Sequence, residues 1–395
     1  MKKTLLTICL VWMCFSLSAQ KIIDLSGKWS FSIDRQDNGE KEKWFSHTLN
    51  DFINLPGSMP EKLKGDEVTA KTQWTGSLYD SSYYYNPYME KYRKEGNIKF
   101  PFFLTPDKHY VGAAWYQKEV NIPADWKGER ILLFLERPHI ETTVWVNGQK
   151  TGMQNSLCVP HQYDITRYVR PGKCTITIRV DNRIKEINVG PDSHSITDQT
   201  QGNWNGIVGR ICLQTTPKTY FDDIQIYPEP EQKLARVKVV IKGTGTAKVK
   251  LSAESFNTDK KHIVPAIQQE IKLNKGVTET EMVLPMGNDM LLWDEFHPAL
   301  YKLKAEVTNG KKTEIKEIQF GMRRFEIKGK WFYVNGRKTQ LRGTVENCDF
   351  PLTGYAPMDV ESWERVFRIC RSYGLNHMRF HSFCPPEAAF IAADR

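Results

Sequence analysis

Long apolar runs are absent from the sequence after its first twenty residues, which excludes membrane-spanning helices from the rest of the chain. The run from Leu5 to Phe15 is itself too short to cross a bilayer. It lies between the basic pair Lys2-Lys3 and Ser18-Ala19-Gln20, whose small residues suit signal peptidase. We therefore expect residues 1–20 to be a signal peptide. The mature protein is expected to cross the inner membrane into the periplasm and to carry no membrane anchor.

Short motifs of several large enzyme classes are also missing. The sequence contains no P-loop, no G-x-S-x-G nucleophile turn, no H-E-x-x-H zinc motif and no glycine-rich dinucleotide fingerprint. Its cysteines form no C-x-x-C pair and show no spacing typical of zinc ligands. We therefore expect a function that needs neither a metal ion nor an organic cofactor.

Cysteines are widely spaced, and only six of the eight follow the expected signal peptide. This spacing favours isolated, buried thiols that act as small hydrophobic side chains. A disulfide between Cys158 and Cys174, or between Cys174 and Cys212, is the alternative. The six are Cys158, Cys174, Cys212, Cys348, Cys370 and Cys384.

Charge of one sign is not concentrated in any long block. The 395 residues include 55 Lys and Arg against 46 Asp and Glu, a formal net charge of +9. Scattered charge of this size gives little reason to expect nucleic acid as a partner. Apolar residues make up 40% of the chain, which is enough for packed cores. The length corresponds to about two to four domains.

Short alternating strands fill the sequence from residue 21 to about residue 218. Asn147-Gly148 is a strong hairpin signal, and Pro171-Gly172 marks another turn. Many strands without a long helical pattern predict a β-sandwich of the jelly-roll type. Residues 66–110 interrupt this rhythm with an aromatic-rich loop. The loop is either pinned to the sandwich or forms an aromatic wall beside a sugar pocket.

Residues 219–320 again consist of strands separated by polar turns. We interpret residues 235–242 and 246–253 as the two arms of a hairpin, and residues 270–273 and 279–284 as further strands. A segment of about a hundred residues with frequent turns predicts an immunoglobulin-like sandwich.

The pattern then changes to alternating strands and helices. Residues 325–334 predict a hairpin, which Asn335-Gly336 extends into a third strand. Residues 359–370 carry apolar side chains at helical spacing, residues 376–380 form a short strand, and residues 386–394 begin another helix. This order predicts the opening of a parallel α/β unit. A whole (β/α)8 barrel needs roughly 250 residues, so we interpret the segment as the truncated start of a TIM barrel.

Eight short motifs occur in a fixed order along the chain. They are Ala114-Trp115-Tyr116-Gln117-Lys118, Val144-Trp145-Val146-Asn147-Gly148-Gln149, Tyr163-Asp164-Ile165-Thr166, Val180-Asp181-Asn182, Trp204-Asn205-Gly206-Ile207-Val208-Gly209-Arg210, Gly321-Met322-Arg323-Arg324-Phe325, Val334-Asn335-Gly336 and Leu341-Arg342-Gly343. In this order they resemble glycoside hydrolase family 2, which holds β-galactosidases, β-glucuronidases and β-mannosidases. The resemblance implies a jelly-roll sugar-binding domain at 21–218, an immunoglobulin-like sandwich at 219–320 and a barrel start at 321–395.

The resemblance also implies a retaining glycosidase acting on oligosaccharides or polysaccharide-derived substrates. Such enzymes need two carboxylates roughly 5–5.5 Å apart, and in this family both are glutamates at later barrel strands. We expect both to lie beyond residue 395, so that no catalytic residue is assigned and this chain alone is inactive. We interpret Glu346 and Asp349 as ligand contacts or as ion-pair partners of Arg342, and Asp294-Glu295 as structural.

Five residues are expected to face the sugar, because the resemblance places them around the pocket. Asn347-Cys348 stands where β-galactosidase-like members carry a His-Glu pair, and His381 lies one position earlier than the family's histidine. Arg342 either holds a carboxylate with its planar guanidinium or braces the barrel floor. Asn203 and Trp204 belong to a loop directed at the barrel mouth, where Trp204 is either a sugar-stacking ring or part of the core.

Two functions therefore remain open. The first is the N-terminal portion of an exo-β-glycosidase, with β-galactoside or β-glucuronide at the non-reducing end of its substrate, since the departures at Asn347 and His381 alter the β-galactosidase-like hydrogen-bond set. The second is a non-catalytic carbohydrate-binding or interaction protein built from two sandwiches. The sequence does not indicate an oligomeric state.

Overall fold

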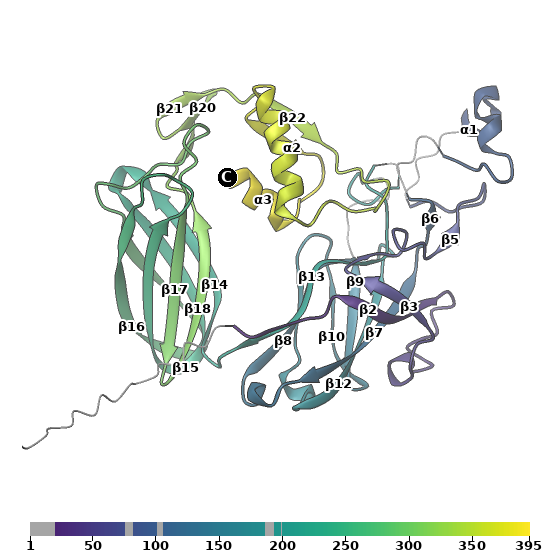
Figure 1. The fold of residues 1–395 in the computed structure, drawn as a ribbon, viewed down its shortest axis with the longest axis horizontal. Coiled ribbons are helices and arrows are strands. Elements are labelled where there is room, and N and C mark those ends of the chain that lie inside the picture. Colours follow the sequence, from purple (N-terminus) through teal and green to yellow (C-terminus); the bar gives the residue numbers. More distant parts are fainter. Residues whose placement is uncertain (1–19, 76–81, 101–105, 186–192, 199) are drawn as a thin grey trace, which may run out of the picture.

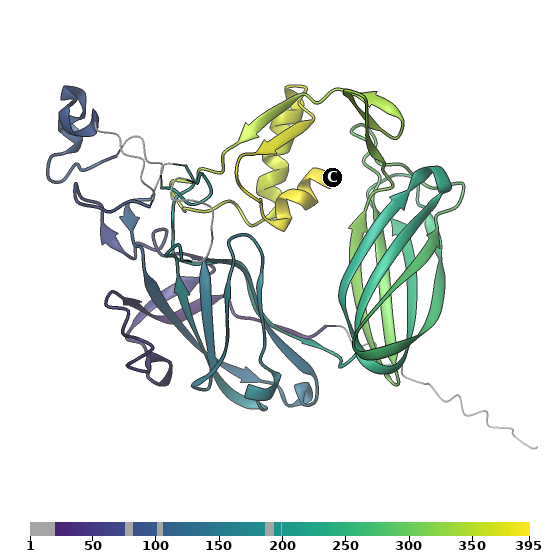
Figure 2. The ribbon, with the colours of Figure 1, turned by 180° about the vertical axis from the view of Figure 1, so that it is seen from behind.

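A computed structural model describes residues 20–75, 82–100, 106–185, 193–198 and 200–395. Residues 1–19 of the expected signal peptide lie outside these residues, as do Tyr79, Phe102 and Phe103 of the aromatic-rich loop. The protein is mainly β. Two antiparallel sandwiches stand side by side, and a smaller unit of strands and helices lies between them at one end (Figure 1, Figure 2).

The first sandwich has two antiparallel sheets and short helical turns. Its elements are β1 (Ile22–Asp24), β2 (Gly27–Asp34), η1 (Trp44–Ser46), β3 (Asp51–Leu55), β4 (Gly57–Ser58), β5 (Asp66–Glu67), α1 (Ser82–Tyr85), η2 (Pro87–Tyr92), β6 (Lys108–His109), β7 (Ala113–Ile122), η3 (Ala124–Trp126), β8 (Arg130–His139), β9 (Glu141–Val146), β10 (Gln149–Asn155), β11 (His161–Asp164), η4 (Thr166–Tyr168), β12 (Gly172–Asp181) and β13 (Gly206–Thr216). One sheet runs β1-β13-β8-β11, with β4 paired to β13, and the other runs β10-β9-β12-β7-β2-β3.

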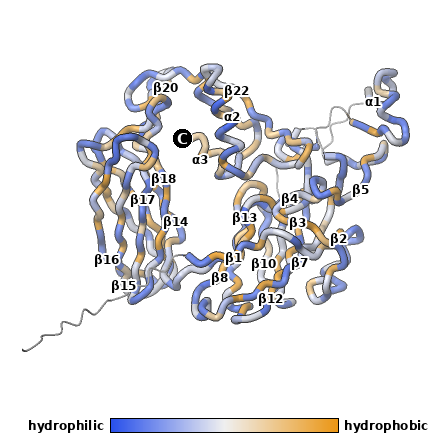
Figure 3. The backbone as a smooth tube through the Cα atoms, in the orientation of Figure 1, coloured by the Kyte–Doolittle hydropathy of each residue, from blue (hydrophilic) through white to orange (hydrophobic). Residues whose placement is uncertain are grey.

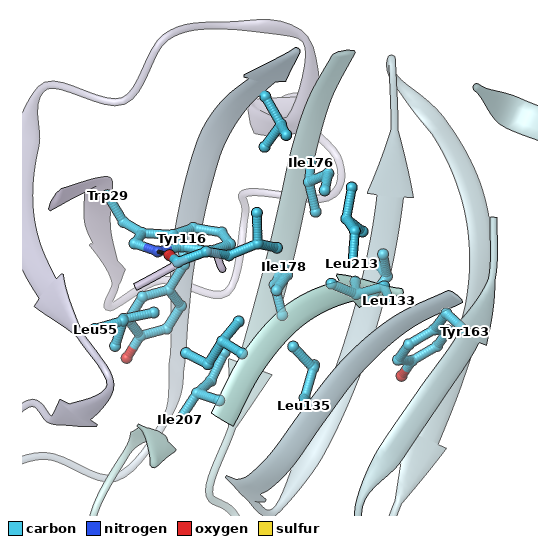
Figure 4. Packing of buried hydrophobic residues seen from close by; sticks show 14 of the residues in the cluster. Trp29, Leu55, Tyr116, Leu133, Leu135, Tyr163, Ile176, Ile178, Ile207 and Leu213 are labelled. Carbon is cyan, nitrogen blue, oxygen red and sulfur yellow. Dashed lines mark hydrogen bonds between the residues drawn. The ribbon is translucent and has the colours of Figure 1, made fainter. Parts of the chain in front are cut away.

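Alternation of apolar and polar residues along these strands builds the core between the two sheets. Tyr116 and Ile178 of one sheet are buried against Leu133 and Leu213 of the other (Figure 4). The predicted Asn147-Gly148 hairpin is confirmed: Val146 pairs with Gln149, and both turn residues adopt positive φ. The first sandwich therefore follows directly from the strand pattern and its turns.

The second sandwich differs from the prediction in how its strands are joined. It consists of β14 (Tyr220–Glu229), η5 (Pro230–Gln232), β15 (Leu234–Ser255), β16 (Ile263–Pro285), β17 (Tyr301–Asn309) and β18 (Lys312–Phe320). The predicted hairpin of residues 235–242 and 246–253 is wrong, because both arms belong to the single strand β15. The segments 270–273 and 279–284 likewise belong to one strand, β16.

Glycine explains why β15 bends instead of turning back. The pairing of β15 with β16 shifts register between Gly243 and Gly245, which marks a bulge. A Cβ on Gly243 would lie 2.6 Å from Thr219 Oγ1, so only glycine allows this close approach. Past the bulge, β15 exchanges β14 for β17 as its second neighbour. Hydrophobic and hydrophilic residues alternate along these strands (Figure 3), and the inward set forms a separate core.

The third unit confirms the predicted alternation of strands and helices. It contains β19 (Phe325–Lys328), β20 (Trp331–Val334), β21 (Arg337–Thr339), β22 (Gly343–Glu346), α2 (Val360–Ser372), β23 (His377–Phe380) and α3 (Glu387–Asp394). The first three strands form an antiparallel sheet, whereas β22 and β23 pair in parallel. Asp359 caps α2 by accepting the Ser362 N–H, and Gly374 follows the helix with positive φ.

Both sandwiches hold this third unit in place. From the second sandwich, the Trp293 indole donates to the Asp394 carbonyl at 2.7 Å. Glu295 of the same sandwich accepts hydrogen bonds from Arg342 and Asn376 of the third unit. This agrees with the structural role predicted for Asp294-Glu295. On the side of the first sandwich, the Tyr355 hydroxyl contacts Glu61 at 3.0 Å. Among the described residues, no helix is long and apolar enough to cross a membrane.

The core of the third unit is small and depends on one side chain. Trp363 is buried between Phe367 and Phe380. We predict that Trp363→Ala lowers the free energy of unfolding of this unit by about 3–5 kcal/mol. The unit should then unfold while both sandwiches stay folded. Limited proteolysis should then remove residues 321–395 first. Tyr373→Ala, at a position 82% exposed just after the same helix, is the control and should leave the cleavage pattern unchanged. Equal proteolysis of the two variants would contradict the prediction.

Candidate functional site

The candidate site lies where the parallel strands β22 and β23 end. Ligands of parallel α/β structures bind at the carboxyl ends of the strands, because the loops there converge. Here Asn347 follows β22 and His381 follows β23. The segment that precedes β13, described at residues 193–198 and 200–205, brings side chains of the first sandwich to the same place.

Gln201 joins the first sandwich to both strand ends. Its amide nitrogen donates to the Asn347 carbonyl at 3.0 Å and to the His381 carbonyl at 3.1 Å. The side chain is buried, so these two hydrogen bonds are shielded from water. One amide therefore fixes the positions of two residues that the sequence analysis assigned to the site.

Two histidines meet above this contact. The Nδ1 atoms of His194 and His381 are 3.3 Å apart, and their ring centroids are 4.8 Å apart. One ring must donate and the other accept for this contact to be a hydrogen bond, so at least one ring is neutral when it forms. His194 is exposed and His381 partly exposed, which leaves ring nitrogens available to a ligand.

Carboxylates lie beside the histidine pair. Burial, followed by the charge of Glu346, raises the pKa of Asp349 to about 6, while His194 acts in the opposite direction. Asp349 Oδ1 is buried and has no hydrogen-bond partner among the described residues. Glu346 accepts the Cys348 N–H at 2.8 Å. An unpartnered buried acceptor beside the His194 imidazole is suited to receiving a hydroxyl group.

Asn203 and Trp204 form the support under the site. They are only 5% and 6% exposed. The Asn203 amide donates to Thr75 Oγ1 and to the Asn182 carbonyl. Trp204 packs between His139, whose ring is stacked on it with a centroid distance of 4.6 Å, and Tyr355 at 5.5 Å. Of the two roles considered for Trp204, the structure supports the core residue.

Burial of His139 affects its charge. Desolvation lowers the pKa of His139 to about 4, although Asn203 opposes this shift. The ring is therefore neutral at pH 7 and stacks on Trp204 as an uncharged aromatic group. A neutral ring needs no counter-charge in this packed layer.

Arg342 does not join the cluster. It precedes β22 and lies at the opposite end of the strand, where its guanidinium donates to Glu295 and to the Gly374 carbonyl. The ion pair of Arg342 with Glu346 or Asp349, one of the two alternatives considered from the sequence, is absent among the described contacts. Arg342 holds the Glu295 carboxylate and the Gly374 carbonyl with its guanidinium, at the base of the unit and away from the predicted sugar site.

A buried carboxylate connects the aromatic-rich loop to the site. Asp198 accepts the N–H groups of Thr75 at 2.6 Å and of Asn203 at 2.9 Å, and it contacts His109 Nε2 at 3.3 Å. The base of the loop is thus tied to the segment that carries Gln201. Trp74 packs against Phe100 and His109 within the loop, and Tyr110 at its end is buried in the core of the first sandwich, which favours the pinned loop of the two predicted alternatives.

Two of the eight non-glycine residues with positive φ among the described residues lie at the same strand ends. Cys348 and Ser382 have φ values of 61° and 54°, and each follows directly after one of the two site residues Asn347 and His381. Non-glycine residues with this conformation are uncommon and cluster at functional sites. Both residues line a cavity of about 40 Å³ under the cluster, together with Gln201 and Trp204.

A larger groove of about 920 Å³ lies between the first sandwich and the helices of the third unit. Its lining is mostly apolar, as at Leu352 and Ile391. Arg210 at its edge is already paired with Glu136 and Glu387. Asp349 also lines this groove, so the groove borders the polar cluster at the strand ends. Binding sites combine apolar walls with a few convergent polar groups of this kind.

Sequence analysis missed His194, Asp198 and Gln201. They lie in a polar stretch between the Val180-Asp181-Asn182 motif and the motif that begins at Trp204. A polar stretch inside a strand-rich domain is the sequence feature from which a functional segment could have been predicted. Among the described residues, no group of three or more His, Cys, Asp or Glu side chains could hold a metal ion. The cluster thus offers hydrogen-bond donors and acceptors, which recognise hydroxyl groups.

Comparison with known proteins agrees with this architecture. The profile described as "Glycosyl hydrolases family 2, sugar binding domain" matches residues 22–217, and that described as "Glycosyl hydrolases family 2" matches residues 219–323. The chain belongs to glycosyl hydrolase family 2. Its resemblance to that family in the sequence analysis is confirmed.

Individual relatives are distant. A "Beta-glucuronidase" of Paenibacillus borealis is 23% identical over 95% of this chain and 57% of its own length. A "Beta-galactosidase" of Thermoanaerobacter pseudethanolicus is 24% identical over 75% of this chain and 39% of its own length. The solved β-glucuronidase of Ruminococcus gnavus has a TM-score of 0.69 at 19% identity, covering 95% of this chain and 58% of that chain. The chain therefore spans about half the length of such relatives.

The raised pKa of Asp349 predicts a pH-dependent cost to stability. In the folded chain the Asp349 carboxyl has a pKa of about 6, whereas the ordinary pKa of an Asp carboxyl is 3.8. Stability therefore falls as the pH rises between these values. We expect Asp349→Asn to match the unmodified chain in Tm below pH 4 and to exceed it above pH 6. The exposed Asp259→Asn serves as control and should show no such divergence. Parallel Tm curves for Asp349→Asn and the unmodified chain would contradict this prediction.

Removal of the Gln201 amide should loosen both strand ends. Gln201→Leu leaves the Asn347 and His381 carbonyls without their donor, at a cost of about 1–3 kcal/mol. Hydrogen exchange is expected to speed up at residues 343–348 and 377–382, with little change in the second sandwich. Gln268→Leu, at an exposed position of β16, provides the control. Unchanged exchange at both strand ends would show that Gln201 does not hold them.

Proposed function

We propose that the chain is the N-terminal portion of a retaining exo-β-glycosidase that hydrolyses O-glycosidic bonds in oligosaccharides. In this proposal, β22, α2, β23 and α3 are the first two units of a (β/α)8 barrel. The domains are the sugar-binding sandwich at 21–218, the immunoglobulin-like sandwich at 219–320 and the barrel start at 321–395. Family membership and the parallel order of β22 and β23 support this assignment.

One observation carries the proposal: a sandwich segment and two parallel strand ends converge on a single polar cluster. Gln201 fixes the loop that bears His194 against Asn347 and His381. In this account Asn347, His381 and Asp349 hydrogen-bond sugar hydroxyls. Asn203 and Trp204 support the loop from below and define its position. Arg342 has no contact with the substrate and stabilises the base of the barrel unit.

The catalytic carboxylates belong, in this proposal, to barrel strands that follow residue 395 in a longer protein. A retaining mechanism needs an acid/base and a nucleophile roughly 5–5.5 Å apart on either side of the glycosidic bond. Glu346 ends β22 and accepts the Cys348 N–H, and Asp349 follows it three residues later. In this proposal both carboxylates belong to one wall of the sugar pocket. The residues of this chain thus bind and orient the sugar, and the chain alone is inactive.

The proposed substrate is an oligosaccharide or polysaccharide fragment with β-galactoside or β-glucuronide at its non-reducing end. Curated relatives include proteins named for both activities. The basic start and apolar run of residues 1–20 support export to the periplasm, where such fragments would be processed. Neither nucleic acid nor a membrane anchor is part of this proposal.

Two assays on aryl β-glucuronide, β-galactoside and β-mannoside test the proposal. We expect no turnover by the 395-residue chain and turnover by a protein extended through the reading frame that follows Arg395. In the extended protein, His381→Ala should lower kcat/KM by roughly 10–100-fold, because a substrate hydrogen bond is lost. His297→Ala, on the surface of the second sandwich, should have no effect.

Two results would contradict the proposal. Turnover by the 395-residue chain that Glu346→Gln or Asp349→Asn abolishes would move catalysis into this chain. A stop codon directly after Arg395, together with saturable sugar binding and no turnover, would favour the alternative of a non-catalytic carbohydrate-binding protein.

A further inference from the structure

One arginine holds the backbones of two cysteines from different units. Arg137, near the end of β8, is only 8% exposed. Its guanidinium donates to the Cys384 carbonyl at 2.9 Å and to the Cys158 carbonyl at 3.3 Å. A third bond reaches the Pro385 carbonyl at 3.2 Å. The planar fork of Arg137 thus places a loop of the first sandwich beside the loop that follows β23.

The two cysteines flank one guanidinium, because Arg137 donates to both of their carbonyls. In agreement with this closeness, the backbone N–H of Cys384 lowers the pKa of the Cys158 thiol, and the Cys384 thiol raises it. A disulfide requires a Cα separation of roughly 4.4–6.8 Å, and the shared guanidinium holds the two backbones on either side of one side chain. Burial raises the pKa of the Cys158 thiol, and the Arg137 guanidinium opposes this rise. Cys384 is exposed, so an external oxidant can reach it.

We propose that Cys158 and Cys384 form a disulfide that joins the first sandwich to the third unit. Both thiols are free in the structure, and the bond would form in an oxidising compartment. The inference goes beyond the proposed function and requires only export of the protein. It differs from the two pairings considered from the sequence, which involve Cys174.

The oxidant is a small-molecule or protein disulfide, and the reaction is two successive thiol–disulfide exchanges. The Cys384 thiol first loses its proton. The resulting thiolate attacks one sulfur of the oxidant disulfide and releases the other sulfur as a thiolate. The Cys158 thiolate then attacks the Cys384 sulfur of the mixed disulfide and releases the second oxidant thiolate. The protein loses two protons and two electrons, and the oxidant disulfide becomes two thiols.

Other cysteines are less suited to this reaction. Cys174 and Cys212 are buried in the first sandwich, and Cys370 lies on α2. Cys348 lines the same small cavity as Cys158 and is its nearest competitor. Burial and the neighbouring Glu346 and Asp349 hold the pKa of the Cys348 thiol far above its usual range, which keeps it unreactive.

The disulfide would fix one wall of the candidate site. Cys384 lies three residues after His381, and Phe383 between them packs against the Arg137 guanidinium. A covalent bond at Cys384 therefore restrains the segment that holds His381 against His194. In the reduced protein this segment is held only by hydrogen bonds and packing.

The test uses the whole chain, reduced and then incubated with oxidised glutathione. After remaining thiols are blocked with iodoacetamide, peptide mass mapping without reductant should reveal one linked pair containing Cys158 and Cys384, two hydrogens lighter than the two free peptides. Oxidation should slow proteolysis within residues 375–395 at least several-fold. Addition of dithiothreitol should restore the original rate.

Serine variants separate the disulfide from a structural effect. Cys384→Ser changes an exposed side chain and should abolish both the linked peptides and the protection, as should Cys158→Ser. Cys370→Ser is the matched control and should retain both. Three results would overturn the proposal: alkylation of both cysteines after oxidation, a stable glutathione adduct on Cys384, or linkage of Cys158 to Cys348.

Discussion

The candidate site depends on a single amide group that bridges two parts of the chain. Gln201 comes from the first sandwich, and its two N–H groups are donated to the carbonyls that follow β22 and β23. The first sandwich also holds this unit through Arg137, which donates to the Cys384 and Pro385 carbonyls, whereas Gln201 reaches the ends of both parallel strands. Because the bonds are buried, they define one position of the strand ends relative to the sandwich.

Other contacts extend this constraint in both directions. Asp198 fixes the segment that bears Gln201 to the base of the aromatic-rich loop through Thr75 and His109. Trp204 fills the layer below, between His139 and Tyr355. The polar surface with His194, His381 and Asp349 is therefore carried on a packed aromatic support, which is how a preorganised binding wall is built.

The sequence was a good guide to local structure and a poor one to contacts between units. Asn147-Gly148 and the apolar face of residues 359–370 specify a turn and a helix from neighbouring residues alone. Gly243 was misread as part of a turn, because its role depends on Thr219, which is distant in the sequence. Arg342 and Trp204 were placed near the sugar for the same reason: their partners Glu295, His139 and Tyr355 come from other elements.

The sugar site at the ends of β22 and β23 is tested most directly by an NMR titration of the histidine-labelled 395-residue chain with β-galactosides and β-glucuronides. We predict that the ring signals of His194 and His381 shift together and saturate, while the ring signal of His297 on the second sandwich stays constant. Saturable binding that leaves His194 and His381 unchanged would contradict a sugar site at the ends of β22 and β23.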